Sequence, residues 1–460
     1  MKVIPGEEFD RYWQSLSLNH AGSDQTGQTG AGHGGAADAV VQEIIAAVGA
    51  EGDQALRRYA ALFDRSSPEK LEVDPQVSRE AWRELKTGEP ELAAALELAA
   101  AHIKRFSLEQ KKQFVDFEYE MEEGIITGQR VIPVERAAVY APGGRFPLVS
   151  TVLMGLIPGY AAGVEELILA SPPGADGLPD RRILAAAALA GDLGGNFPRI
   201  FSMGGAQAVA ALALGTETVP RCDLIVGPGN KYVAAAKRLL YGRTGIDFIA
   251  GPTDVLIIAE PRASFPQAAD LIAADMLAQA EHDGDARARV LVPSEAGPAL
   301  AAGILAALER RLARLPTASV ARASLDAGGL IVSYRDRKEA VRIANIIAPE
   351  HLELLVEEPE IWAGGLKNYG SLFLGSLSAE ALGDYSAGIN HTLPTSGSAR
   401  FTGGLSVRHF LKTPTTLRCL PGPGFEAARR AAEIIAGAEN LPGHAQSAAA
   451  RSPDTAPPPQ

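Results

Sequence analysis

The chain has 460 residues, 46% of them hydrophobic, so it can bury a large core and should divide into two or more domains. Its formal net charge of -12 argues against nucleic acid and anionic membrane surfaces as partners. The cysteines, Cys222 and Cys419, are too few for a disulfide framework or a thiolate zinc site, so a bound metal would need His, carboxylate or amide ligands.

The N-terminal part of the chain is predicted to be mainly helical. Its first residues, MKVIPGEEFD, lack the apolar stretch of a signal peptide, and no apolar run approaches the ~20 residues that span a bilayer, so we expect a cytoplasmic protein. Residues 19–35 are rich in Gly, Ser, Thr and Gln, which predicts a flexible insertion. From about residue 38 to 117, apolar residues recur at the spacing of amphipathic helices.

The chain then alternates between short apolar runs and helical stretches. The runs RAAVYAP, VEELILAS, RIFSMGG and DLIVGP suit buried parallel strands, and Ala-rich stretches such as RRILAAAALAG separate them. A second series follows with VLIIAE, ARVLVPS, GGLIVSY, HLELLV and SLFLG. This alternation predicts an α/β fold with two doubly wound units in tandem. Past about residue 400 the strands are expected to cease in favour of helix, and residues 452–460 are expected not to fold.

Gln279 and His282 lie in DLIAADMLAQAEHDGD, which is predicted to be an amphipathic helix that ends at Asp283 and Gly284. Residues three apart share a helix face, so an amide oxygen and an imidazole nitrogen could both reach one zinc ion. The commoner explanation for such a pair is a solvated last turn, where a cationic side chain also suits the helix dipole.

Glu350 and His351 lie in NIIAPEHLELLV, which predicts a helix broken at Pro349 and a strand that follows the pair. A carboxylate beside an imidazole supplies a general base and a proton-relaying partner near neutral pH, as alcohol oxidation requires. The alternative is a pair that makes local hydrogen bonds at a helix-to-strand turn.

Asp384 and His391 lie in LGDYSAGINHTLPTSG, a predicted loop rich in Gly and Ser. Loops of this kind carry function more often than packing. Asp384 could complete a mixed oxygen and nitrogen zinc shell, or it could be an Asx-turn residue. His444, in ENLPGHAQ, has no local feature that separates it from a plain surface histidine.

Three glycine-rich segments lie at predicted strand-to-helix junctions: YAPGG (140–144), MGGAQAVAA (203–211) and GPGNKYVAAAK (227–237). Glycines there let the backbone approach a phosphate at a helix N-terminus. None has the full Gly-x-Gly-x-x-Gly series, so each alone is a weak indication. Three in one half of the chain favour a nucleotide site.

In order and spacing, these motifs resemble those of the histidinol dehydrogenase family. They are YAPGG, GGAQAVAALALG, GPGNKYV, GIDFIAGPTDVLIIAE, DMLAQAEHD, APEHLEL, DYSAGINHTLPTSG and ENLPGH, and the resemblance runs from about residue 38 to residue 451. It implies a homodimer with two incomplete Rossmann-like domains, extended by helices at both ends. It also implies oxidation of L-histidinol to L-histidine through the aldehyde with two NAD, the last step of histidine biosynthesis.

By position, the resemblance implies a role for each candidate residue. One zinc ion per subunit would be held by Gln279, His282, Asp384 and His444, with His444 reaching across from the other subunit, and it would orient the substrate. His351 would take the hydroxyl proton, and Glu350 would activate water. NAD would be bound by Tyr140, Gln207 and Asn230. The substrate would be lined by Thr253, Gln279, His282, Glu350, His351, Asp384, His391, Glu439 and His444.

We expect the chain to divide into two α/β domains and several extensions. The first domain, with the zinc and catalytic residues, would comprise residues 36–139 and 251–400, and the second, which binds NAD, residues 140–250. The extensions would be residues 1–18, the insertion 19–35, a helical dimer-crossing segment over 401–451, and a disordered tail over 452–460.

One motif departs from the family pattern, which commonly reads Gly-Pro-Ser-Glu where this chain has Gly251-Pro252-Thr253-Asp254. The hydroxyl survives, but the added methyl and the shorter carboxylate alter the shape beside the substrate. The alternative is therefore a related zinc and NAD dehydrogenase for another polar diol, such as dihydroxypropanesulfonate. Retention of Glu439 favours a substrate with an ammonium group. A metal- and nucleotide-binding protein without catalysis is a third reading, against which every expected ligand and base position is occupied.

Overall fold

The computed structural model describes residues 1–22, 35–64, 66, 68–143, 147–260, 267–295 and 297–452. Most of the expected insertion, and all but the first residue of the expected tail, lie outside the described residues. Within the insertion, residues 19–22 complete helix α1 (Gly6–Gly22). The chain forms two compact units, Met1–Glu109 with Val134–Phe410, and Gln110–Pro133 with Leu411–Gln460.

The first unit contains two parallel sheets, of which the first has six strands in the order β1-β13-β12-β11-β14-β15. From β11 the chain moves outward through β12 to β13, and it then places β14 on the other side of β11. This reversal is the switch point of a doubly wound sheet. The strands are β1 (Lys2–Pro5), β11 (Asp254–Ala259), β12 (Arg287–Pro293), β13 (Leu330–Tyr334), β14 (His351–Leu355) and β15 (Ser371–Leu374).

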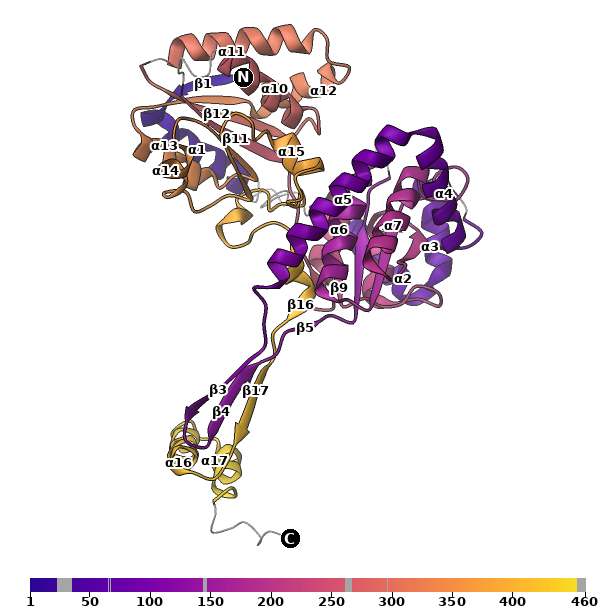
Figure 1. Cartoon of the computed structure of the whole chain (residues 1–460), viewed down its shortest axis with the longest axis vertical. Helices are drawn as coiled ribbons and strands as arrows, with labels where there is room; N and C mark the ends of the chain where they lie inside the picture. Colours follow the sequence, from indigo (N-terminus) through magenta and orange to yellow (C-terminus); the bar gives the residue numbers. More distant parts are fainter. Residues whose placement is uncertain are drawn as a thin grey trace. The chain divides into compact units, whose positions relative to one another are not determined.

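Helices cover both faces of this sheet (Figure 1). One face carries α10 (Ala268–Ala280), α11 (Gly297–Leu312) and α12 (Ala318–Gly328), and its core includes Ile272, Val290 and Ile304. The other carries α1, α13 (Arg337–Ile347) and α14 (Pro359–Ala363), with Phe9 and Trp362 in its core. Because both faces are buried, the strands are continuous apolar runs, as the sequence predicts.

The second sheet has the order β10-β9-β6-β7-β8-β2 and is parallel except for β2. Here β6 lies between β7 and β9, so this sheet also has a switch point, beside β6. Its strands are β2 (Glu72–Val73), β6 (Arg136–Tyr140), β7 (Glu166–Ser171), β8 (Arg199–Ser202), β9 (Leu224–Val226) and β10 (Gly245–Ile246). The predicted α/β fold with two doubly wound sheets is therefore confirmed.

Two groups of helices pack on the second sheet. One shares an apolar core with β6, β7 and β8 and consists of α2 (Gly35–Glu51), α3 (Asp53–Tyr59), α8 (Gly205–Leu214) and α9 (Lys231–Leu240). On the other side, α6 (Val149–Ala162) packs so closely on β6 that a Cβ on Gly155 would lie 2.3 Å from a Val139 methyl. Helix α7 (Arg181–Gly194) packs beside α6, α4 (Pro75–Gly88) packs on α7, and α5 (Pro90–Lys111) follows α4 in the chain.

The division of the chain differs from the expected one at the N-terminal side. Residues 36–139 were expected with the first sheet, but β2 pairs with β8 of the second sheet, and α2 packs on α8 and α9. The expected extension 1–18 contains β1, which pairs with β13 at the edge of the first sheet. Helical periodicity shows which face of a helix is buried but not the sheet that buries it, and this explains the difference.

The second unit contains an antiparallel sheet in the order β17-β4-β3, so the prediction that strands cease past residue 400 is wrong. Strand β17 (Thr415–Cys419) pairs with β4 (Ile125–Gln129), which pairs with β3 (Phe117–Glu122), and β16 (Leu411–Lys412) pairs with β5 (Ile132–Pro133). The predicted C-terminal helical stretch is present as α16 (Pro423–Ala438) and α17 (Pro442–Ala449).

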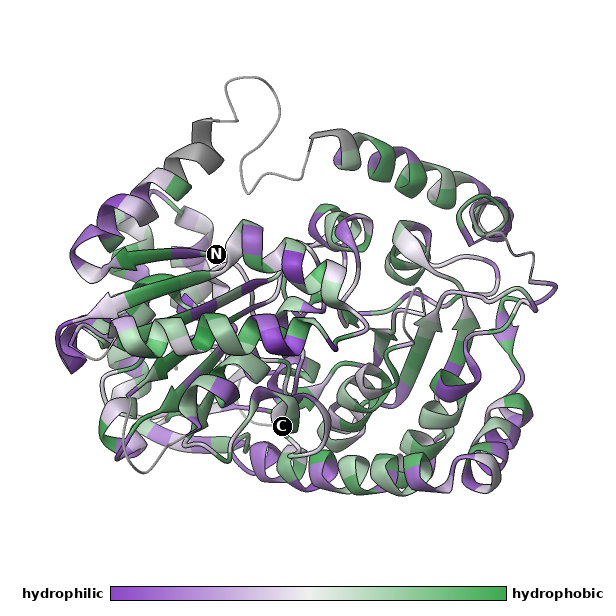
Figure 2. Ribbon diagram, turned by 90° about the horizontal axis from the view of Figure 1, so that it is seen from above, coloured by the Kyte–Doolittle hydropathy of each residue, from purple (hydrophilic) through white to green (hydrophobic). Residues whose placement is uncertain are grey.

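Hydrophobic residues concentrate along the strands and on the helix faces turned toward them (Figure 2). Helices with this amphipathic distribution belong to water-exposed layers around a buried sheet. Among the helices that the structure describes, none combines the length and the apolar character needed to cross a membrane.

Candidate active site

The residues predicted to carry chemistry meet at the amino edge of the first sheet. Strands β11 and β14 are parallel neighbours that begin at the same edge, so Thr253, just before β11, lies beside Glu350, just before β14. Helix α10 returns from the carboxyl edge and brings Gln279 in its last turn to the same place. Helix α15 (Glu380–Tyr385) adds two carboxylates.

Glu350 is buried but well supplied with hydrogen bonds. Its Oε2 accepts from Thr253 Oγ1 at 2.5 Å and from the backbone N–H of Asp254 at 3.1 Å. Burial raises the pKa of Glu350 to about 7, against the opposing influence of His351. A carboxyl group with this pKa exchanges its proton near neutral pH, which is what a general base requires.

Asp254 supports Glu350 rather than facing away from it. Its Oδ1 accepts from the backbone N–H of Glu350 at 3.1 Å, and its Oδ2 accepts from Arg289 Nη1 at 2.8 Å. Asp254 and Arg289 are both buried, and the guanidinium lies 5.4 Å from the centroid of the Trp13 ring. Through these contacts Asp254 belongs to a buried ion pair that also holds the backbone of Glu350.

His351 lies among carboxylates at the start of β14. Its Nε2 is 3.2 Å from Asp384 Oδ1, and its Nδ1 is 4.0 Å from Glu350 Oε2. Burial lowers the pKa of His351, but Glu380, Glu350 and Asp384 together outweigh burial and raise it well above its ordinary value. Burial acts to raise the pKa of Asp384, but its hydrogen bond to His351 and the electrostatic influence of His351, His391 and His282 together outweigh burial and lower it. The two side chains therefore form a buried ion pair.

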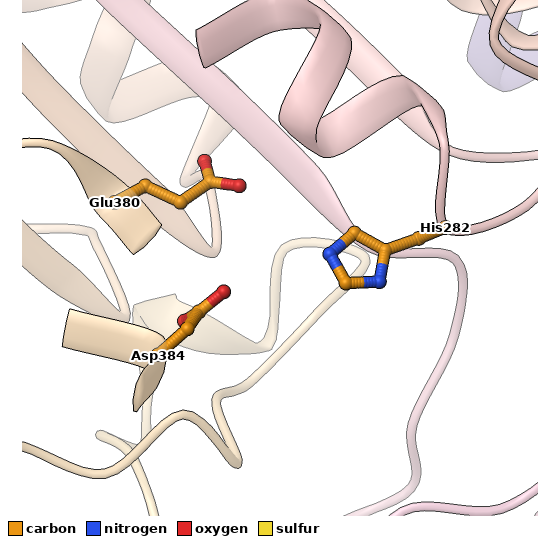
Figure 3. Close-up of side chains that lie close together, drawn as sticks. All are labelled: His282, Glu380 and Asp384. Atoms are coloured by element: carbon orange, nitrogen blue, oxygen red, sulfur yellow. The ribbon is translucent and has the colours of Figure 1, made fainter. Parts of the chain in front are cut away.

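A cluster of candidate metal ligands adjoins this pair. The ligand atoms of His282, Glu380 and Asp384 lie within 4.8 Å of one another, and Figure 3 shows the three side chains pointing toward a common space. Zinc takes imidazole nitrogen and carboxylate oxygen at ~2.0–2.2 Å, so small side-chain rotations would bring all three onto one ion. The donor set fits zinc.

Glu380 is a member of this cluster that the sequence reasoning missed. Its side chain is buried, and burial raises its pKa to about 8. The available indication was its position four residues before Asp384, which places both carboxylates on one face of α15. That indication required a helix where a loop was expected.

Gln279 lies between the candidate metal ligands and Thr253, which donates a hydrogen bond to Glu350. It is fully buried, and its Nε2 donates to Thr253 Oγ1 at 2.5 Å. In the reversed amide orientation its nitrogen instead donates to Glu380 Oε1 at 2.8 Å. The helix ends at Ala280, so the expectation that Gln279 and His282 share a helix face is wrong, although both side chains reach this site.

The remaining substrate candidates fall into two groups. His391 lies next to Asp384, with its Nδ1 3.0 Å from the Asp384 carbonyl oxygen and its Nε2 3.1 Å from Thr151 Oγ1, and burial lowers its pKa. Glu439 and His444 belong to the second compact unit, where their side chains are exposed at the end of α16 and in α17.

A cavity of about 1170 Å³ opens at the carboxyl edge of the second sheet, and its lining extends to His282. Tyr140 ends β6, Gln207 lies in the first turn of α8, and Asn230 caps α9, so all three candidates for NAD binding line this cavity beside the switch point. Ligands of doubly wound sheets bind at such crevices.

Hydrogen bonds and close backbone contacts hold the strand-to-helix junctions beside the cavity. The hydroxyl of Tyr140 accepts from the backbone N–H of Gly205 at 3.1 Å, and Asn230 Oδ1 accepts from two N–H groups at the start of α9, at 3.0 and 3.2 Å. Gly227 has φ +110°, and a Cβ there would lie 2.2 Å from the Tyr140 carbonyl oxygen, so only glycine suits this position.

A buried ion pair, Lys237 with Asp247, binds the backbone of the Gly227 loop, and it was not predicted from the sequence. Lys237 Nζ donates to the Gly227 carbonyl at 3.0 Å and to Asp247, while Asp247 Oδ2 accepts from the Gly227 N–H at 2.8 Å. Lys237 is 3% exposed, so this contact is removed from solvent. The pair fixes both polar groups of one glycine at the edge of the cavity.

Two doubly wound sheets, a cavity large enough for a dinucleotide and a buried carboxylate–imidazole pair define an α/β dehydrogenase. Residues 31–452 match the family model described as histidinol dehydrogenase. The histidinol dehydrogenase of Thermus thermophilus is 47% identical over 408 residues, which are 89% of this chain and 93% of that protein. The chain belongs to the histidinol dehydrogenase family of oxidoreductases.

Two further comparisons agree with this membership. The histidinol dehydrogenase of Prochlorococcus marinus strain MIT 9313 is 45% identical over 409 residues, covering 89% of this chain and 88% of that protein. The crystal structure of histidinol dehydrogenase from Elizabethkingia anophelis matches with a TM-score of 0.81 and 34% identity, covering 90% of this chain and 91% of that one. The similarity therefore extends over nearly the whole chain, in sequence and in fold.

Proposed function

We propose that this protein oxidises L-histidinol to L-histidine through L-histidinaldehyde with two NAD, as the last step of histidine biosynthesis in the cytoplasm. One observation carries the proposal: the buried Glu350 and His351 adjoin a zinc-compatible cluster in a chain of this family. The cavity lined by Tyr140, Gln207 and Asn230 supports NAD as the oxidant.

The proposed zinc ligands are Gln279, His282 and Asp384, with His444 contributed by the other subunit of a homodimer. The closeness of His282 and Asp384, and the burial of Gln279 beside them, support this set. Glu380 lies among these donors and is either a further ligand or the acceptor that orients the Gln279 amide. When bound, zinc would orient the substrate through its imidazole and amino nitrogens.

His351 and Glu350 would divide the proton transfers. His351 would first give a proton to Glu350, whose Oε2 lies 4.0 Å from Nδ1, and the neutral ring would then take the hydroxyl proton of histidinol. Glu350, with a pKa of about 7, would release that proton to solvent before it takes a proton from the water that attacks the aldehyde. NAD, when bound, accepts a hydride from the same carbon in each oxidation.

The remaining proposed contacts concern substrate orientation. Thr253 and His391 border the cluster and supply hydroxyl and imidazole groups to a polar substrate. Glu439 belongs to the second compact unit, as His444 does, and its carboxylate would bind the ammonium group of the substrate.

A single assay tests the proposal. NAD reduction by zinc-loaded protein is followed with L-histidinol and, separately, with dihydroxypropanesulfonate, before and after chelation. We expect two NADH per L-histidinol, loss of turnover after chelation and recovery with zinc. Absence of turnover with L-histidinol, or faster turnover with the sulfonate, would contradict the proposed substrate.

A further inference from the structure

Asp64 is a carboxylate that the mechanism does not use. It ends the π-helix η2 (Ala60–Asp64) and lines the cavity together with Phe63 and Tyr140. Its Oδ2 is buried and has no hydrogen-bond partner among the described residues. Burial raises the pKa of Asp64 to about 6, so the group is mainly charged above neutral pH. The Asp64 side chain is only partly buried where it lines the cavity, so a carboxylate oxygen on the cavity side can accept hydrogen bonds from hydroxyl groups of a ligand.

The position of Asp64 indicates which part of a dinucleotide it meets. The catalytic pair lies at the amino edge of the first sheet, and the part of the cavity nearest to it is lined by Glu281 and His282. The nicotinamide ring must lie at that end to exchange a hydride. Asp64 follows the helices that pack on the second sheet and acts electrostatically on Tyr140 at the end of β6. The adenosine half would therefore lie beside Asp64.

The charges of the described residues that line the cavity also favour an adenosine ribose without a phosphate beside Asp64. The described residues that line it include no lysine and no arginine, and its carboxylates are Asp64 and Glu281. A ribose with free 2′- and 3′-hydroxyls can donate to Asp64. A 2′-phosphate there would place like charges together.

We propose that Asp64 accepts hydrogen bonds from the adenosine ribose hydroxyls and thereby selects NAD over NADP. The assignment rests on the proposed use of a nicotinamide dinucleotide by this chain, and it names the residue that sets which one is bound.

The test is equilibrium binding of NADH and NADPH, followed by nicotinamide fluorescence at about pH 8, where Asp64 is charged. We expect the parent protein to prefer NADH by at least about tenfold, and Asp64→Asn and Asp64→Ala to reduce that preference by about tenfold. Asp64→Asn keeps the shape of the side chain, and Asp64→Ala also removes the acceptor. Asp192→Asn, at an exposed position of α7, is the matched control and should keep the parent's preference.

An unchanged preference in both Asp64 variants, or a parent that binds NADPH as tightly as NADH, would overturn the assignment. Oxidation of L-histidinol by the parent is measured separately. A protein that prefers NADH through Asp64 but does not oxidise L-histidinol supports this assignment and contradicts the proposed function, so the two can fail independently.

Discussion

Glu350 is held in a state that opposes folding at the pH where it would work. Its pKa rises from about 4.5 to about 7 on burial. A rise of this size corresponds to about 3 kcal/mol between the two protonation states. Because the pKa is raised in the folded protein, the stabilising contribution of the protonated group is complete below about pH 4.5 and is lost as the pH rises through 7.

Glu350→Gln should therefore stabilise the protein at about pH 8, by up to about 3 kcal/mol, and change its stability little at about pH 5. Chemical unfolding of parent and variant at both pH values measures the difference. Glu97→Gln, at an exposed position of α5, should have no effect at either pH. An equal gain for Glu350→Gln at both pH values would show that burial of the charge is not its cause.

The same residue should set the pH dependence of the second oxidation. Since the base must be deprotonated to activate water, turnover of L-histidinaldehyde should rise with pH through about 7. Glu350→Gln should lower turnover by roughly 10² to 10⁴ and remove this rise. The measurement is NAD reduction with supplied aldehyde between about pH 5 and pH 9. A variant that oxidised the aldehyde as fast as the parent would contradict the role.

At the scale of elements, the loop that leads into α9 is stabilised by the buried ion pair of Lys237 and Asp247. Lys237 and Asp247 together engage the N–H and the carbonyl of Gly227, and Asn230 at the end of this loop lines the cavity. Breaking a buried pair leaves one charge without a partner, which costs more than the pair itself contributes.

Lys237→Met should lower the free energy of unfolding by about 3–5 kcal/mol, because Asp247 stays buried without its cation. It should also weaken NADH binding, since the Gly227 loop loses a support. Denaturant unfolding and fluorescence titration measure the two effects, and Lys70→Met provides an exposed control. NADH affinity equal to that of the parent in a destabilised Lys237→Met would show that the pair supports the fold alone.

The elements themselves show what the sequence can and cannot predict. Most strands of the two sheets were predicted because parallel strands buried on two faces are continuous apolar runs, such as VLIIA in β11, whereas the short edge strands β1, β2 and β10 were not predicted. The antiparallel pairing of β17 with β4 was not, because it joins segments far apart in the chain. Contacts of this kind also explain the missed residues: Arg289 matters through Asp254, and Lys237 through Asp247. A local sequence pattern does not show which distant residue a side chain will contact in the folded chain.

At the scale of the whole molecule, the second unit exposes apolar surface. On α16, Ile434 is 73% exposed and Ile435 59%, and Leu417 on β17 is 69% exposed. Exposed apolar side chains grouped on one small unit favour a partner, and a second copy of this chain fits the proposed homodimer.

Ile434→Glu should convert a dimer into monomers and lower bound zinc, because His444 would come from the other subunit. Light scattering after size-exclusion chromatography gives the mass, and metal analysis gives the zinc content. Leu98→Glu, at a residue of α5 that is 53% exposed, should leave both unchanged. A parent protein that is monomeric and retains a full complement of zinc would contradict a ligand shared between subunits.

The pairing of β17 with β4 has a consequence for biosynthesis. Residues 125–129 emerge from the ribosome before most of either parallel sheet, whereas their neighbour at 415–419 emerges after both. Until then one edge of β4 has no strand to pair with, and unpaired edges invite association with other chains. A nascent chain halted before residue 415 should therefore be more prone to aggregate than the completed protein, even though its two α/β sheets can already form.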